Sequence, residues 1–330
     1  MSKTLRAGVI GCGSMGEEHS RALAEAGGMK MAAFCDARAE AAEALCGKFA
    51  GEYSCTDPQK LFEDASLDAI YVCTYHDSHA ELCVRAADAG KHIMVEKPLA
   101  MTVDQCRQVG RAVEKNGVRL MIGFMMRYYE LIRKAREIIP APLIVIMQMM
   151  DRRWPDDFIL NDPAKGGGNI IAQGCHSCDL LRFLAGAEPI EVYASGGNYY
   201  TANGLADNIC ATFRFENGVA NSWVQGNANH QEPLSKFFLQ VFAADVSVSL
   251  THRFCKLVVS RAGQPAEEIL ADESAGFVEE NRDFVRALQE DTPPAIDHRD
   301  GLMATLMVLQ AMASAKSGQP EPIKSVFEDQ

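Results

Sequence analysis

The sequence predicts an α/β protein of two domains, with a parallel sheet in the first and a larger open sheet in the second. Its 330 residues suit roughly two domains of ordinary size. Short apolar runs alternate with helical patterns as far as Gly123, which is typical of βαβ units and a parallel sheet. Beyond that point most strand patterns follow one another directly, which indicates an α+β domain with a mainly antiparallel sheet. We therefore expect domains over residues 1–123 and 124–330.

The N-terminal region alternates strand and helix patterns. Glycines at 27, 90 and 117 follow three of the helices, where a left-handed residue often ends a helix. The expected strands are 5–10, 29–35, 69–73, 92–95 and 119–123, and the expected helices are 17–26, 37–49, 61–64, 79–89 and 103–116.

The C-terminal region is richer in strands. Asn217-Gly218 lies between two of them and predicts a type I′ hairpin turn. An apolar strand such as 237–242 in an open sheet needs cover, so we expect a homodimer or homotetramer, and the last helices can pack back on the first domain. Residues 143–150 form a long apolar run. The expected strands are 190–196, 209–215, 219–225, 236–242, 246–250 and 256–260, and the helices are 129–139, 169–184, 277–289 and 299–317.

Composition narrows the class of protein. A net charge of −12 disfavours nucleic acid and anionic membranes as partners. No apolar window approaches the ~18 residues of a membrane-spanning helix, and no signal peptide is recognisable, so we expect a cytoplasmic protein. The eleven cysteines are scattered, which favours reduced thiols. Cys175 and Cys178 form a C-x-x-C without a second pair, so we expect no metal site.

A glycine-rich turn follows the first expected strand. Gly11-Cys12-Gly13-Ser14-Met15-Gly16 has the spacing G-x-G-x-x-G and opens a helix. In a Rossmann domain the first glycine permits the tight turn, the second lets the backbone approach a pyrophosphate, and the third allows helix–strand packing. The pyrophosphate then lies at the helix N-terminus, where free N–H groups favour anions. This turn therefore predicts a dinucleotide site.

An acidic residue ends the second expected strand. Asp36 lies twenty positions beyond Gly16, where a carboxylate can accept hydrogen bonds from both ribose hydroxyls of NAD and repel a 2′-phosphate. Arg38 is close enough to pair with such a phosphate, so the use of NADP stays open. NAD is the expected cofactor.

Three further segments resemble one known family. Residues 89–100, which contain Gly90-Lys91-His92 and Glu96-Lys97-Pro98, resemble the AGKH-x-x-x-EKP-L signature of the Gfo/Idh/MocA oxidoreductases. The turn from Cys73 to His79 is similar to the family's T-P-x-x-x-H, with Tyr75 in place of proline. Residues 166–179 resemble its G-G-G-x-x-x-D-x-G-x-H-x-x-D segment.

The resemblance implies NAD(P)-dependent hydride transfer at a carbinol carbon of a sugar, a sugar derivative or a cyclitol. It also implies that Glu96 and Lys97 lie on the nicotinamide side of the cofactor. The dinucleotide groove would be lined by Ser14, Met15, Cys73, Thr74, Tyr75 and His79.

Lys97 and His176 are the expected catalytic residues. Lys97 ends a strand at the edge where α/β sheets bind ligands, and a partly desolvated lysine there can exchange a proton with the reacting oxygen. His176 suits a proton shuttle because histidine titrates near neutral pH, and Asp179, one turn later, could orient it. Ala172 stands where many members of the resembled family carry an acid, so the usual Lys–Asp–His constellation is missing here. Proton transfer then rests on Lys97 with His176, or on a group that the sequence does not place.

Arginine and aromatic side chains suit a polyhydroxylated ring. Such side chains cluster around the start of the second domain, where Tyr128 and Arg152 accompany the arginines and the tryptophan named below. Weaker candidates are Asn229 and His230, and Met125 replaces an asparagine common in the family. The expected substrate-binding residues are Arg127, Arg153, Trp154, Gln173, His176 and Asp179.

Two other functions stay open. One is a redox-neutral sugar-processing enzyme of the glycosidase or lyase type, which holds NAD tightly and returns its hydride. The other is a non-catalytic NAD-sensing regulator, against which the pairing of Lys97 and His176 argues.

Overall fold

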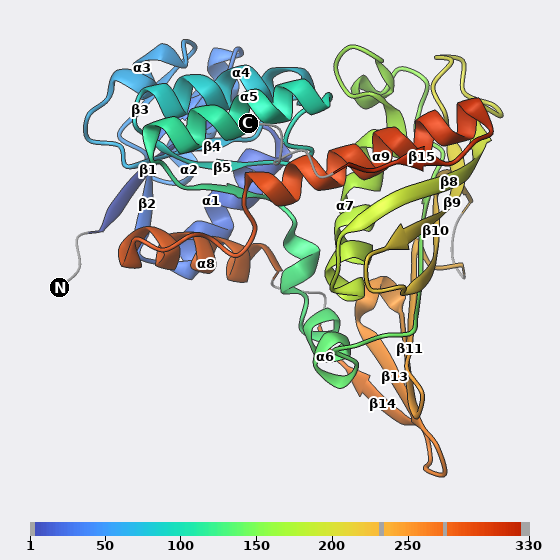
Figure 1. The fold of residues 1–330 in the computed structure, drawn as a ribbon. Coiled ribbons are helices and arrows are strands. Elements are labelled where there is room, and N and C mark those ends of the chain that lie inside the picture. Colours follow the sequence, from blue (N-terminus) through green and yellow to red (C-terminus); the bar gives the residue numbers. More distant parts are fainter. Residues whose placement is uncertain (1–3, 231–233, 273–275, 325–330) are drawn as a thin grey trace. The chain divides into compact units, whose positions relative to one another are not determined.

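The computed structural model describes residues 4–230, 234–272 and 276–324 (Figure 1). The chain divides into two compact units, each described by itself below. Unit 1 comprises Met1–Met125 and Ala275–Leu302, and unit 2 comprises Met126–Ser274 and Met303–Gln330. The C-terminal segment thus contributes to both units.

Unit 1 contains a six-stranded sheet in the order β3-β2-β1-β4-β5-β6, in which all paired strands are parallel. The order reverses between β1 and β4, and ligands of such sheets bind beyond the carboxyl ends of the strands at that point. The strands are predominantly apolar because helices cover both faces. Their bounds are β1 Leu5–Ile10, β2 Met29–Cys35, β3 Tyr53–Cys55, β4 Ala69–Val72, β5 His92–Val95 and β6 Leu120–Ile122.

Helices α1 and α8 lie on one face of this sheet, and α4 and α5 lie on the other (Figure 1). α5 shows how local chemistry sets a helix: the Thr102 hydroxyl accepts the N–H of Gln105 at 3.2 Å, and left-handed Gly117 ends the helix. The bounds are α1 Ser14–Ala26, α2 Ala39–Lys48, α3 Gln59–Glu63, α4 His76–Asp88, α5 Val103–Asn116 and α8 Gly276–Glu290.

Unit 2 contains a nine-stranded sheet in the order β14-β13-β12-β11-β7-β10-β9-β8-β15. Only the β7–β10 pair is parallel among the described strands, so the sheet is mixed and mainly antiparallel. The bounds are β7 Ile144–Arg152, β8 Pro189–Gly197, β9 Asn208–Phe215, β10 Ala220–Asn229, β11 Phe237–Phe242, β12 Val246–Thr251, β13 Lys256–Arg261, β14 Glu267–Leu270 and β15 Glu321–Pro322.

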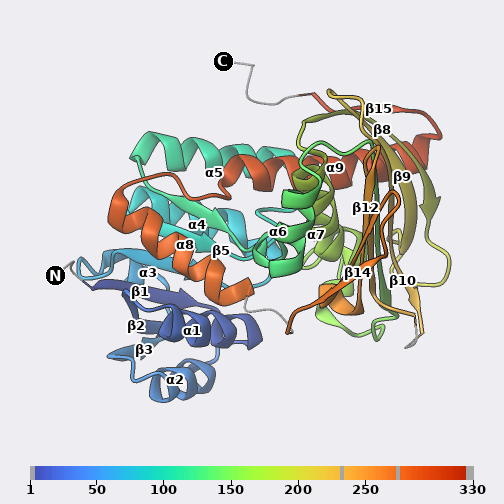
Figure 2. The same ribbon diagram turned by 90° about the horizontal axis from the view of Figure 1, so that it is seen from below.

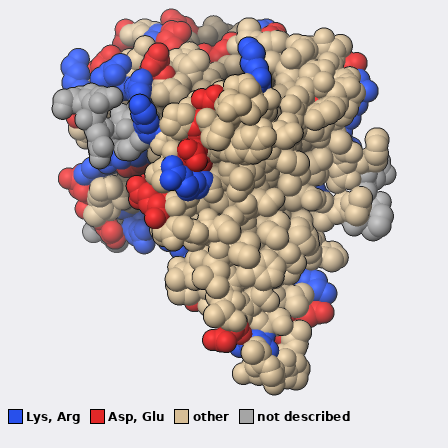
Figure 3. Space-filling view, turned by 45° about the vertical axis from the view of Figure 1, so that its right-hand side comes forward, with Lys and Arg blue, Asp and Glu red and all other residues tan. Residues whose placement is uncertain are grey.

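The helices of unit 2 cover one face of that sheet. α6 (Glu130–Ile138) lies near β12 and β13, while α7 (Gly168–Ala185) packs on β7 and β10. α9 (His298–Ser317) belongs to unit 2 from Met303 onward, where the Ser314 hydroxyl accepts the N–H of Ala194 in β8. The opposite face carries no helix from the described residues (Figure 2). Few charged side chains lie on that side (Figure 3).

The expected fold class is confirmed, with local differences. β3, β14 and β15 were not expected, because strands of two to four residues carry no clear alternation. The type I′ prediction is wrong: Gly218 N–H donates to Phe215 O at 3.0 Å, which centres the turn on Glu216-Asn217. Asn217 instead accepts the N–H of Val219 and donates to Ala185 O. Gly27 has φ +75° but an extended ψ of 179°, so it is not the left-handed cap that was expected.

Candidate active site

The glycine turn after β1 has the geometry of a dinucleotide seat. Gly11 has φ +96°, and a β carbon there would lie 2.4 Å from Cys73 O. At Gly16 it would lie 2.0 Å from Gly11 O, so neither position admits a side chain. A β carbon at Gly13 would meet nothing within 4 Å apart from its chain neighbours. Helix α1 begins directly after Gly13 and has no side-chain cap. The exposed first turn of α1 therefore fits a pyrophosphate group.

Asp36 lies beside this turn. One carboxylate oxygen accepts the N–H of Cys12 at 2.8 Å, and the other accepts the N–H of Arg38 at 2.9 Å. The exposed Arg38 Nε also lies 3.4 Å from the second oxygen. Of the about four lone pairs of the carboxylate, one therefore remains, and a ribose hydroxyl can gain another by displacing this long Arg38 contact. Burial first, then the Asp36 charge, raises the pKa of Cys12 to about 12, so this thiol is no nucleophile. The Arg38 side chain is 71 % exposed and stands at the mouth of the seat.

The turn after β4 lies beside the glycine turn, because a β carbon on Gly11 would meet the backbone of Cys73 and Thr74. Tyr75 is 52 % exposed, and the Thr74 hydroxyl shares a 2.7 Å hydrogen bond with Ser78. His79 is wholly buried, with its ring nitrogens 2.8 Å from Pro98 O and 3.1 Å from Thr74 O. Burial lowers the pKa of His79, while the two carbonyl acceptors act in the opposite direction. The neutral ring has one N–H and donates to only one of these oxygens at a time. His79 thus ties the turn after β4 to the turn after β5.

Glu96 belongs to a buried network that sequence analysis missed. His19 Nε2 lies 3.2 Å from the Glu96 carboxylate, and the Asn281 amide nitrogen lies 3.2 Å from His19 Nδ1. The same amide donates to Phe277 O at 2.8 Å, so Nδ1 must accept and Nε2 carries the proton that faces Glu96. Tyr71 donates to the Asn281 carbonyl oxygen at 2.9 Å.

The network reaches Lys97 through its backbone. Lys97 N–H donates to the second Glu96 oxygen at 3.1 Å, and its side chain leaves the carboxyl end of β5 half-buried. A histidine on the inner face of α1 was the only sequence signal for this network. Its partner Asn281 lies 262 residues away, beyond the range of any local pattern.

In unit 2 the expected residues gather on α7. His176 is 4 % exposed, Ala172 is buried, and Gln173 is half-buried on the same helix. The Arg127 guanidinium grips the Asp179 carboxylate with two hydrogen bonds, one of 2.8 Å, and stacks 5.2 Å from the Phe183 ring. The two side chains are only 11 % and 2 % exposed, so this pair anchors α7.

The segment after β7 places the other expected residues. Trp154 donates to Asp151 at 3.1 Å and meets the Phe158 ring edge-on at 5.1 Å. Arg153 pairs with Asp156 at 2.9 Å and lies 5.3 Å from the Tyr200 ring. Arginine and aromatic side chains thus share one region of unit 2. Of the remaining candidates, the Asn229 amide donates to Met150 O and Leu234 O, while Tyr128 packs under Arg133.

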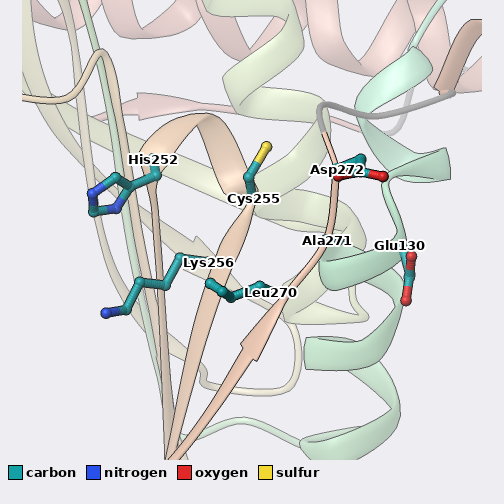
Figure 4. Close-up of a pocket in the computed structure, with 7 residues that line it drawn as sticks. All are labelled: Glu130, His252, Cys255, Lys256, Leu270, Ala271 and Asp272. Atoms are coloured by element: carbon teal, nitrogen blue, oxygen red, sulfur yellow. The ribbon is translucent and has the colours of Figure 1, made fainter.

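A separate open pocket of about 630 Å³ lies in unit 2, lined by Glu130, His252, Cys255, Lys256, Leu270, Ala271 and Asp272 (Figure 4). None of the residues expected to bind substrate lines it. His252 and Lys256 point away from the Asp272 carboxylate in Figure 4, and Lys256 pairs with Glu268 at 2.7 Å. No convergent set of polar groups marks it as a ligand site.

Within residues 4–230, 234–272 and 276–324, no group of histidine, cysteine, aspartate and glutamate could hold a metal ion. No helix in those ranges is long and apolar enough to cross a membrane.

The strand order, the glycine seat and Asp36 define an NAD-binding Rossmann domain. Residues 5–124 match the oxidoreductase family with an NAD-binding Rossmann fold, and residues 140–242 match the GFO/IDH/MocA C-terminal domain. The chain belongs to the Gfo/Idh/MocA family, and the protein is an NAD-dependent oxidoreductase.

Relatives extend over the whole chain. The myo-inositol 2-dehydrogenase of Thermotoga maritima is 26 % identical, covering 98 % of this chain and 100 % of the relative. The scyllo-inositol 2-dehydrogenase (NAD(+)) of Bacillus subtilis is 25 % identical, covering 97 % and 96 %. A levoglucosan dehydrogenase solved with NADH has a TM-score of 0.89 at 21 % identity, covering 98 % and 100 %, and shares the fold.

Proposed function

We propose that the protein is a dehydrogenase or reductase that interconverts a secondary alcohol and a ketone on a cyclitol or sugar. The observation that carries this proposal is the placement of Lys97. Its backbone is held by buried Glu96 at the carboxyl end of β5, in the same sheet as the glycine seat after β1. The named inositol and levoglucosan dehydrogenases among the relatives support the substrate class.

Oxidation requires a hydride and a proton to leave one carbinol group. NAD, when bound, supplies the acceptor for the hydride. Lys97 Nζ, in its neutral form, takes the hydroxyl proton as the C–O bond becomes a carbonyl, and it returns that proton in the reverse direction. We assign His176 to relaying the proton onward to solvent. Ala172 offers no carboxylate, so no acid on that turn of α7 takes part.

The cofactor residues follow from the seat. The N–H groups of Ser14, Met15 and Gly16 would hold the pyrophosphate, and Asp36 would bind the adenosine ribose. Thr74 and Tyr75 would border the groove, whereas His79 and Glu96 act from behind it because both are buried. We assign Arg153, Trp154 and Gln173 to the substrate, and Arg127 and Asp179 to holding α7.

The decisive experiment follows NADH absorbance while the protein and NAD meet inositols, hexoses, uronic acids and anhydrosugars. A polyol-dependent rise supports the proposal. NAD binding without any rise, but with NAD-dependent cleavage of a glycoside, would support the redox-neutral alternative. NAD binding with neither outcome, in both reaction directions, would favour a regulator.

We also propose that the protein is a homo-oligomer joined through the helix-free face of the unit 2 sheet. Phe238, Gln240 and Phe242 are half-buried on β11 while its alternate residues are buried, and few charges lie on this side (Figure 3). A sheet face with few charges is typical of an interface. A monodisperse monomer by light scattering at micromolar concentration would refute this assignment.

A further inference from the structure

A buried chain of hydrogen bonds in unit 2 links β10 to α7. Trp223 and Gln225 lie on β10, and Ser177 and Asn169 lie on α7. The first three are 0 % exposed and Asn169 is 2 % exposed. None of the four takes part in the chemistry proposed above.

The donors and acceptors along this chain of hydrogen bonds can be assigned in only one direction. The indole N–H of Trp223 can only donate, and it donates to Ser177 Oγ at 2.8 Å. The serine hydroxyl therefore offers its one proton onward, and the Gln225 carbonyl oxygen accepts it at 2.8 Å, closer than the alternative acceptor Gly174 O at 3.2 Å. The amide nitrogen of Gln225 therefore faces the first turn of α7, where Asn169 lies.

The same logic orients Asn169. Gln225 Nε2 donates to Asn169 Oδ1 at 2.9 Å, so Asn169 Nδ2 must point elsewhere. Nδ2 is buried and meets no acceptor among the described residues. Leaving such a donor unpaired costs stability, and native proteins pair nearly all of them. The hydrogen bonds from Trp223 through Ser177 and Gln225 thus fix the orientation of the Asn169 amide, and its Nδ2 lacks only an acceptor.

The position of this donor on α7 indicates its acceptor. With 100° per residue, Asn169 and His176 lie within about 20° of each other around the helix and about 10 Å apart along it. Gln173 lies between them along the helix axis, and its neighbour Ala172 contributes only a methyl group. The first turn of α7 has no side-chain cap, so its N–H groups add a positive potential that favours an oxygen atom.

We propose that Asn169 donates a hydrogen bond from Nδ2 to an oxygen of the polyol substrate, on the face of α7 that carries His176. Gln225, Ser177 and Trp223 are positioning residues that fix the amide. Asn169 thereby selects substrates with an oxygen at one particular ring position. This inference rests on the proposed polyol dehydrogenase function.

Two variants break the same hydrogen bond from opposite ends. Asn169→Leu removes the substrate donor together with the bond to Gln225, whereas Gln225→Met removes that bond and leaves Asn169 in place. Similar losses of melting temperature are expected. With NAD saturating and the best polyol of the panel, beginning with myo-inositol, Asn169→Leu should lower kcat/KM about 10-fold or more beyond Gln225→Met.

The substrate provides a second readout. Monodeoxy analogues of the same polyol each lack one oxygen. The wild-type protein should disfavour one analogue by about 10-fold because its buried donor is left unpaired, and Asn169→Leu should lose that one preference only. Equal losses in the two variants, or an unchanged analogue preference, would overturn the inference and leave Nδ2 with a buried water.

Failure of the inference is distinct from failure of the proposed function. Calorimetry of the NADH-loaded protein measures polyol binding without turnover. A wild-type protein that binds a polyol without oxidising it, and loses binding only in Asn169→Leu, would keep the inference and refute the dehydrogenase. Turnover by the wild type with equal losses in both variants would refute the inference alone. No binding and no turnover with any polyol would refute both.

Discussion

Replacement of Asp36 by alanine should change cofactor preference by an amount that the structure allows us to work out. The carboxylate accepts the backbone N–H groups of Cys12 and Arg38, at 2.8 and 2.9 Å, and the exposed Arg38 Nε at 3.4 Å. Two ribose hydroxyls can bind if they use the remaining lone pair and displace this last contact. Hydrogen bonds to a charged acceptor contribute about 1.5–3 kcal/mol each. Loss of two costs at least about 3 kcal/mol, so the Kd of NAD should rise about 100-fold.

The effect on NADP should be much smaller. Its 2′-phosphate gains nothing from Asp36 and is repelled by it, while Arg38 is exposed and free to approach once the carboxylate is gone. Asp36→Ala also removes the acceptor of the Cys12 N–H and loosens the glycine turn. This loosening weakens the binding of NAD and NADP alike. The differential loss therefore isolates the ribose contact from the structural one.

Fluorescence titration of both cofactors with wild type, Asp36→Ala and Asp36→Asn measures this difference. The asparagine control keeps one oxygen that can accept a backbone N–H, so it should retain the turn better than alanine does. Equal factors of weakening for NAD and NADP in Asp36→Ala would refute the reasoning, because Asp36 would then support the turn without contacting the ribose.

Three more predictions follow from the site. Lys97→Ala should lower kcat by about 100-fold or more while calorimetry still detects NAD binding, and unimpaired turnover would remove Lys97 from the mechanism. Glu96→Gln should lower kcat about 10-fold with little change in KM. His19 and the Lys97 N–H bind different carboxylate oxygens, and the amide keeps only one oxygen, so one donor loses its acceptor. A lower melting temperature with unchanged kcat would reduce Glu96 to a structural role. Arg127→Ala should destabilise the fold by about 3–5 kcal/mol in urea, since it removes both guanidinium hydrogen bonds from the buried Asp179 carboxylate, and an unchanged midpoint would contradict the assigned anchoring of α7.

Local pattern accounts for most of the secondary structure. The strands at Leu5–Ile10, Met29–Cys35 and His92–Val95 and the helix at Val103–Asn116 occur at the expected bounds. Their apolar periodicity is strong and their ends carry glycines or caps. The hairpin at Asn217-Gly218 differs because the Asn217 side chain bonds to Ala185, which no local rule contains.

The sequence by itself determined the fold class, the family and the NAD seat. The glycine turn and Asp36 fall within one βαβ unit, where chain connectivity brings them together whatever the rest of the molecule does. The roles of other residues were decided by tertiary structure. Glu96 faces a histidine 77 residues away, Asp179 meets an arginine 52 residues away, and Asn169 is oriented by a glutamine 56 residues away. Which donor meets which acceptor depends on how whole elements cross in space, and periodicity within one element carries no information about that crossing.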